Sequence, residues 1–198
     1  MTPTARMTPA GQVTRERVVR AAMDAFANHG YRGASLDAIA AAVGLTRQGL
    51  LHYFPSKVRL LMAVLELGQQ DDITLITRLV EEHPEWSMSE TLGAIIRNNL
   101  SRPGIAQLRT ALAGEAINPD HPGHQWFVDV YRYARSEIAR WVAREQAEGR
   151  ITTAIPPERL AMTIIAVIDG LQLQAQLDPE PPDVEQALAA LMAVLATG

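Results

Sequence analysis

Residues 35–57 read SLDAIAAAVGLTRQGLLHYFPSK, and this stretch decides the fold that we expect. Apolar residues recur at helical spacing after Ser35, a residue type that caps helices: they are Leu36, Ile39, Ala40 and Val43. Gly44 ends this helix of about two turns. Thr46 can cap a second short helix, which Pro55 terminates. The stretch therefore predicts two helices joined by a tight turn.

The residues on either side extend this motif. A helix beginning near Thr14 is predicted by the stripe Val19, Ala22, Met23 and Phe26, and Gly30 should end it. Three short helices with glycine in the second turn make a helix-turn-helix. Residues 1–13 contain Pro3, Pro9 and Gly11, and we expect a disordered tail there. A fourth helix capped by Ser56 should run to about residue 69 and connect the helix-turn-helix to the rest of the chain.

The remainder of the chain also favours helices. Alanine and leucine are abundant and aromatic residues make up only 5%, which is typical of helical proteins. The predicted helices cover residues 71–82, 87–101, 104–116, 124–148, 158–177 and 183–196, and no strand is needed. The fold class is therefore all-α, with a helix-turn-helix domain at residues 14–60 and a larger helical domain at 61–198.

Charge is distributed unevenly along the chain. The net charge is −4, but residues 1–60 carry eight basic and three acidic side chains, so this part is +5 and the remainder is −9. A basic N-terminal part joined to an acidic remainder is typical of a protein in which the first part binds a polyanion. The absence of cysteine excludes disulfides and thiolate chemistry, and it suits a reducing cytoplasm.

The stretch 35–57 with its flanks resembles the DNA-binding domain of the TetR family. The matching residues are Phe26, Gly30, Tyr31, Ser35, Ile39, Ala40, Gly44, Leu45, Thr46, His52, Tyr53, Phe54, Ser56 and Lys57. This resemblance implies an all-helical dimer that binds a near-palindromic DNA operator. It also implies a pocket for a small molecule in each C-terminal domain, and more often repression than activation.

The first turn of the second short helix should meet DNA bases, because that helix enters the major groove in such motifs. Arg47 suits guanine edges and Gln48 suits adenine edges. Thr46, Tyr53 and Lys57 are candidates for phosphate contacts. The DNA-facing set also includes Ser35, Gly49 and His52, with Gly49 allowing close approach of the backbone. Leu51 stands where the family usually has a tyrosine, so it is left out of this set.

The larger domain should dimerise and sense a ligand. Residues 160–177 are apolar on more than one face, which predicts a core on one side and a partner on the other. This segment contains Asp169, Gln172 and Gln174, and we expect it to be too short and too polar to span a membrane. The candidate ligand-binding residues are Asn99, Arg109, Glu115, Trp126 and Tyr131.

Other kinds of site find less support. His121 and His124, with Asp120 nearby, could suggest a metal site, but no further ligand has a recognisable spacing to them. No phosphate-binding loop or nucleophile motif is present, so we expect neither an enzyme nor a cofactor. The alternative to a DNA-binding regulator is a helical ligand-binding or scaffold protein without DNA affinity.

Overall fold

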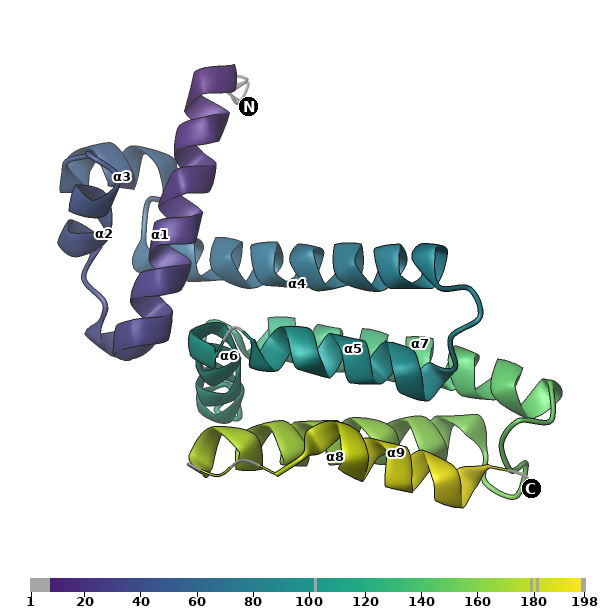
Figure 1. Cartoon of the computed structure of the whole chain (residues 1–198). Helices are drawn as coiled ribbons and strands as arrows, with labels where there is room; N and C mark the ends of the chain where they lie inside the picture. Colours follow the sequence, from purple (N-terminus) through teal and green to yellow (C-terminus); the bar gives the residue numbers. More distant parts are fainter. Residues whose placement is uncertain (1–7, 102, 179, 181, 197–198) are drawn as a thin grey trace. The chain divides into compact units, whose positions relative to one another are not determined.

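The computed structural model describes residues 8–101, 103–178, 180 and 182–196. Across these residues the chain forms nine α-helices, and the only β pairing among them is an isolated bridge between Ile151 and Ala196. The chain divides into two compact units, residues 1–71 and 72–198. Figure 1 shows the order of the helices. The all-α fold class is confirmed.

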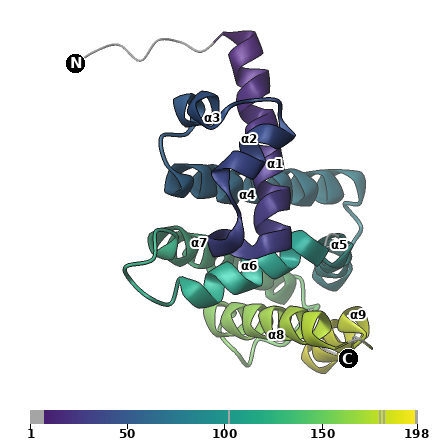
Figure 2. The ribbon, with the colours of Figure 1, turned by 90° about the vertical axis from the view of Figure 1, so that its left-hand side faces the viewer.

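The first unit contains α1 (Pro9–Gly33), α2 (Leu36–Ala42), α3 (Arg47–Tyr53) and the beginning of α4 (Lys57–Glu82). Figure 2 gives a second view of this unit, in which α2 lies against α1. Each helix contributes apolar side chains to one core: these include Val18, Ala22 and Phe26 of α1, Ile39 of α2, Leu50 of α3, and Leu60 and Leu61 of α4. Most of the predicted stripe residues are buried here, whereas Leu36 is only partly buried.

The first helix begins earlier than the sequence suggested. It starts at Pro9 rather than near Thr14, and the side chain of Thr8 caps it by accepting a hydrogen bond from Gly11 N at 3.2 Å. Proline is favoured at the first helical position because its missing N–H would lack a partner there. The expected tail is therefore helical from residue 9 onward, and its first seven residues lie outside the described residues. Gly30 breaks the helical backbone as expected, with φ of 69°.

Helix α4 is one helix of 26 residues, whereas the sequence suggested two, ending and beginning near residue 70. Gly68 lies close to that point, but its backbone stays helical and no proline follows it, so the helix continues. The boundary between the two compact units falls within α4, at residue 71. The helix thus belongs to both units.

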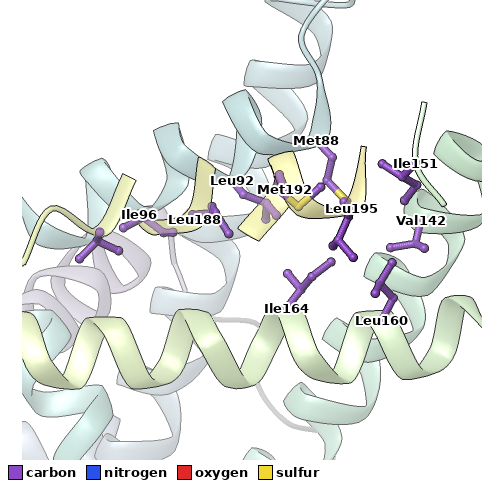
Figure 3. Close-up of a cluster of buried hydrophobic side chains, with 11 residues drawn as sticks. Met88, Leu92, Ile96, Val142, Ile151, Leu160, Ile164, Leu188, Met192 and Leu195 are labelled. Carbon is purple, nitrogen blue, oxygen red and sulfur yellow. The ribbon is translucent and has the colours of Figure 1, made fainter. Parts of the chain in front are cut away.

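The second unit contains the end of α4 with α5 (Met88–Leu100), α6 (Pro103–Glu115), α7 (His124–Ala147), α8 (Pro157–Leu177) and α9 (Val184–Leu195). Its core lies among α5, α7, α8 and α9, where Leu160 of α8 points towards Val142 of α7 and Ile164 of α8 points towards Leu195 of α9 (Figure 3). Helices α7 and α8 pack along one another. Ser87 and Glu90 form the capping box expected at the start of α5.

Helix α8 is the described helix that could cross a membrane by length and composition alone. The sequence-based exclusion on length and polarity was therefore wrong, because the helix has 21 residues and few charges. The same composition is typical of a helix that packs on two sides. Leu160, Ala161 and Ile164 are buried, while Met162, Leu173 and Leu177 are exposed. One face of α8 thus meets the core and another carries apolar side chains at the surface.

Candidate nucleic-acid interface and polar cluster

The turn between α2 and α3 is fixed by backbone hydrogen bonds that require Gly44. Leu45 N donates to Ala40 O at 2.9 Å and Gly44 N donates to Ala41 O at 3.1 Å, which is the Schellman pattern of a helix end. Gly44 has a φ of 74°, a conformation that a side chain disfavours. Arg17 of α1 donates to the carbonyl of Val43 at 3.3 Å. These contacts hold α3 at a set angle to α2.

Helix α3 begins at the residue expected from the sequence. Thr46 caps it, its hydroxyl accepting a hydrogen bond from Gly49 N at 3.1 Å. Leu50 is fully buried, whereas the side chains of Arg47, Gln48 and His52 are exposed. One side of the helix is therefore anchored in the core, and the other presents its first turn to solvent.

Arg47 forms an ion pair that the sequence did not predict. Its Nη1 atom lies 2.7 Å from Oδ2 of Asp37, in the first turn of α2. More than half of each side chain remains exposed, 57% for Arg47 and 63% for Asp37. The pair joins residues ten positions apart across the turn, so only the angle between α2 and α3 brings them together.

Lys57 lies at the first residue of α4 and faces back towards the end of α1. Its Nζ donates to the carbonyl of Arg32 at 3.1 Å and sits 4.9 Å from the ring centre of Tyr31. Partial burial lowers the pKa of Lys57. The ammonium lies near the N-terminus of α4. The backbone amides at a helix N-terminus favour an anion, so both groups could contact the same phosphate.

The other expected DNA-facing residues lie on the same unit. Ser35 is exposed and caps α2 by accepting a hydrogen bond from Ala38 N at 3.2 Å. His52 and Tyr53 contact each other edge to face, with ring centres 5.7 Å apart. Gly49 is partly exposed, between Arg47 and His52 on α3. The eight residues thus lie at the start of α2, in α3 with its cap, and at the start of α4.

In the second unit, two of the five candidate ligand residues come together. Arg109 of α6 forms an ion pair with Asp72 of α4, and the hydroxyl of Tyr131 of α7 interacts with the carboxylate of Asp169 of α8. Arg109 also acts electrostatically on both Tyr131 and Asp169. We call these four residues the polar cluster, and they come from four helices. The two aspartates were not among the predicted binding residues.

The polar cluster is partly shielded from water, and this shifts its titration. Burial raises the pKa of Tyr131 to about 12, with a further contribution from the Asp169 carboxylate. Burial also raises the pKa of Asp169, although the Tyr131 hydrogen bond and the charge of Arg109 oppose this. Tyr131, Asp169 and Arg109 therefore interact electrostatically, and perturbed pKa values of this kind are common in binding sites.

The other three candidates lie elsewhere. Glu115 is exposed and pairs with His121 at 3.7 Å, Trp126 contacts Phe127 edge to face at 4.9 Å, and Asn99 is partly exposed in α5. The structure does not bring them to the polar cluster. Nδ1 of His124 lies 2.8 Å from the carbonyl of Ala116, and Nδ1 of His121 accepts a hydrogen bond from Gly123 N at 3.1 Å. These histidines thus order the loop before α7.

The fold and the exposed first turn of α3 define a helix-turn-helix DNA-binding protein with a helical C-terminal unit. Residues 18–64 match the family of bacterial regulatory proteins, tetR family, and residues 89–198 match the C-terminal domain of BetI-type transcriptional repressors. The chain belongs to the TetR family of transcriptional regulators. It is a DNA-binding transcriptional regulator.

Individual relatives agree with this assignment. The transcriptional repressor AcnR of Corynebacterium efficiens is 24% identical over 157 residues, 79% of each chain. A TetR regulator from Chloroflexus aurantiacus is 25% identical, with a TM-score of 0.82 over 96% of this chain and 100% of that one. A putative regulator from Saccharomonospora viridis, solved in complex with choline, has a TM-score of 0.78 at 20% identity over 94% of this chain and all of its own.

Proposed function

We propose that this protein is a cytoplasmic, dimeric repressor that reads DNA through Arg47 and Gln48 and releases it when a small molecule binds. The observation that carries the DNA-reading part is the first turn of α3, where these two side chains are exposed while Leu50 anchors the helix in the core. Bound to an operator, such a protein blocks transcription by occupancy alone.

Arg47 and Lys57 have different roles in DNA binding in this proposal. Arg47 donates to a guanine edge, which carries sequence information, whereas Lys57 holds a phosphate, which carries none. Arg47→Ala should cost about 1 to 3 kcal/mol per half-site and relax the preference at one base pair. Lys57→Ala should weaken binding to all sequences alike and reduce the salt slope by about one per half-site.

The experiment measures binding of the whole 198-residue chain to duplexes that it selects from a random pool. Arg20→Ala, which removes an exposed arginine of α1 that is not among the expected DNA-facing residues, is the matched control for loss of charge. If Arg47→Ala keeps both the preferred sequence and the affinity, the assignment of base reading is wrong. If the wild-type protein selects no sequence, the chain acts instead as a ligand-binding or scaffold protein.

A second copy of the chain should cover the exposed apolar face of α8, formed by Met162, Leu173 and Leu177. Together with α7, this helix would form a four-helix interface about a two-fold axis. The two equivalent DNA-binding units then contact half-sites separated by roughly 34 to 36 Å, or by a multiple of that distance. Because the two units are related by the two-fold axis, the operator is a near-palindrome.

The effector should bind in the second unit at the polar cluster. Asp72, Arg109, Tyr131 and Asp169 come from four different helices, so a ligand that binds them changes how these helices pack. The two carboxylates outnumber the one guanidinium, which favours a ligand with a positive charge. Because the relative from Saccharomonospora viridis was solved with choline, choline is the first compound to test. A ligand that stabilises the protein but leaves operator affinity unchanged at saturation would show binding without regulation.

A further inference from the structure

We propose that Asp37 is a specificity-determining residue, which positions Arg47 for a base edge and keeps it from serving as a general phosphate contact. This inference rests on the proposed base-reading role of Arg47. It follows from the juxtaposition of the two side chains at the exposed ends of α2 and α3, with Arg47 Nη1 and Asp37 Oδ2 2.7 Å apart.

The position of the Asp37 carboxylate is fixed by its surroundings. Asp37 lies in the first turn of α2, two residues after the Ser35 cap, where the helix dipole favours a negative charge. Ile39 and Ala40 hold the next turn of the helix in the core, and the Gly44 turn fixes the direction of α3. The carboxylate is therefore a rigid point against which a long, flexible side chain can be oriented.

Stability does not explain this ion pair. Both side chains are mostly exposed, and exposed pairs between charged residues contribute little to folding. The pair does restrict Arg47, which otherwise has many rotamers. Holding it in advance reduces the entropy lost when it binds a base. The benefit of the pair therefore lies in recognition rather than in folding.

The hydrogen-bonding chemistry fits a base contact. A guanidinium has five N–H donors, and Asp37 engages Nη1 of Arg47. The remaining donors include the pair needed for O6 and N7 of guanine. A phosphate, by contrast, would bring a second anion close to the Asp37 carboxylate. Asp37 thus favours a base edge over the backbone as the partner of Arg47.

This arrangement has a cost in affinity. Asp37 is an acidic group in the most basic part of the chain, and it repels DNA of any sequence. Replacing it with asparagine should therefore strengthen binding to unrelated DNA while weakening the choice of base. These two effects have opposite directions, and a purely structural role for Asp37 would produce neither.

The experiment compares Asp37→Asn with the wild-type protein on a selected operator duplex, on duplexes with each base pair replaced in turn, and on unrelated DNA. We expect discrimination at the base pair read by Arg47 to fall by about 3- to 10-fold. Binding to unrelated DNA should become tighter, and Asp37→Glu should restore discrimination in part. Asp24→Asn, which removes an exposed acid from α1, controls for the change in charge.

Arg47→Ala separates the possible outcomes. In that background Asp37→Asn should no longer affect discrimination, because the side chain that it positions is gone. If Asp37→Asn tightens operator and unrelated DNA equally, without loss of discrimination, Asp37 merely repels DNA and the inference is wrong. If Arg47→Ala itself leaves the base preference unchanged, it is the proposed base reading that fails.

Discussion

Arg109 of α6 forms an ion pair with Asp72, which lies where α4 enters the second unit. From Asp72 onward α4 carries five aliphatic residues, Ile73, Leu75, Ile76, Leu79 and Val80, and none of them is fully buried. The hydrophobic core of this unit contains none of them. The ion pair thus links α6 to a helix that begins, at Lys57, in the DNA-binding unit.

Asp72→Asn should uncouple ligand binding from DNA binding, because a ligand at the polar cluster would no longer act on α4 through an ion pair. A coupling of about 1 to 3 kcal/mol changes operator affinity by roughly 5- to 150-fold. We expect this factor to fall towards one in the variant, measured by titrating ligand against operator affinity. Glu82→Gln, which breaks the exposed pair with Arg78 on the same helix, should leave the factor unchanged. An unchanged factor in Asp72→Asn would show that the coupling takes another route.

Asp169→Asn should stabilise the protein at neutral pH. Burial raises the pKa of Asp169 in the folded state, so the folded protein binds a proton more readily than the unfolded chain, and stability falls as pH rises through that pKa. The ionised carboxylate is therefore a penalty at pH 7, which asparagine removes while still accepting a hydrogen bond from Tyr131. The advantage of the variant in Tm should shrink as the pH approaches 4. An advantage independent of pH would contradict this explanation.

Gly49→Ala should separate folding from DNA binding. A Cβ atom at this position would lie 3.4 Å from the Thr46 hydroxyl and 3.7 Å from Leu45 Cβ, which the helix accommodates. Because alanine favours helices, the free energy of unfolding should stay the same or rise by up to about 1 kcal/mol. Operator affinity should nevertheless fall if the backbone approaches DNA here. Gly114→Ala, at an open position in α6, should stabilise the protein without that loss.

Arg150→Ala should destabilise the second unit. Glu145 is 4% exposed, and its carboxylate accepts hydrogen bonds from Nε and Nη2 of Arg150 at 2.7 and 2.6 Å. Removing the arginine leaves the buried Glu145 carboxylate without this partner, so the free energy of unfolding should fall. Chemical denaturation measures this cost. Adding Glu145→Gln should recover part of it, and Arg140→Ala, at an exposed pair with Glu137, should cost far less.

Leu173→Asp should disrupt the proposed dimer without unfolding the chain, because Leu173 is 43% exposed on the outer face of α8. Ile168→Asp is a poorer probe, since Ile168 packs against the core of its own unit. We expect sedimentation to show a dimer for the wild type at micromolar concentration and a monomer for the variant. Helicity should remain unchanged. A wild-type monomer under these conditions would remove the proposal of a dimer.

The sequence by itself determined the helical class and most helix positions. Periodic apolar residues and their caps are local signals, and they placed α2, α3 and the Gly44 turn correctly, since the i, i+3 and i+4 spacing follows from helix geometry. The same local logic failed at Pro9, where a residue that usually breaks helices begins one. It also failed near residue 70, where two predicted helices are one.

Only the tertiary structure decided which polar side chains meet. Asp37 and Arg47 are ten residues apart, and Asp72 and Arg109 are 37 apart, so their contacts depend on how whole helices pack. The sequence singled out Arg47, Arg109 and Tyr131 by residue type, but it carried no signal for their carboxylate partners, because an aspartate on a helix is most often a solvated surface residue. Packing, which is non-local, turned those aspartates into parts of sites.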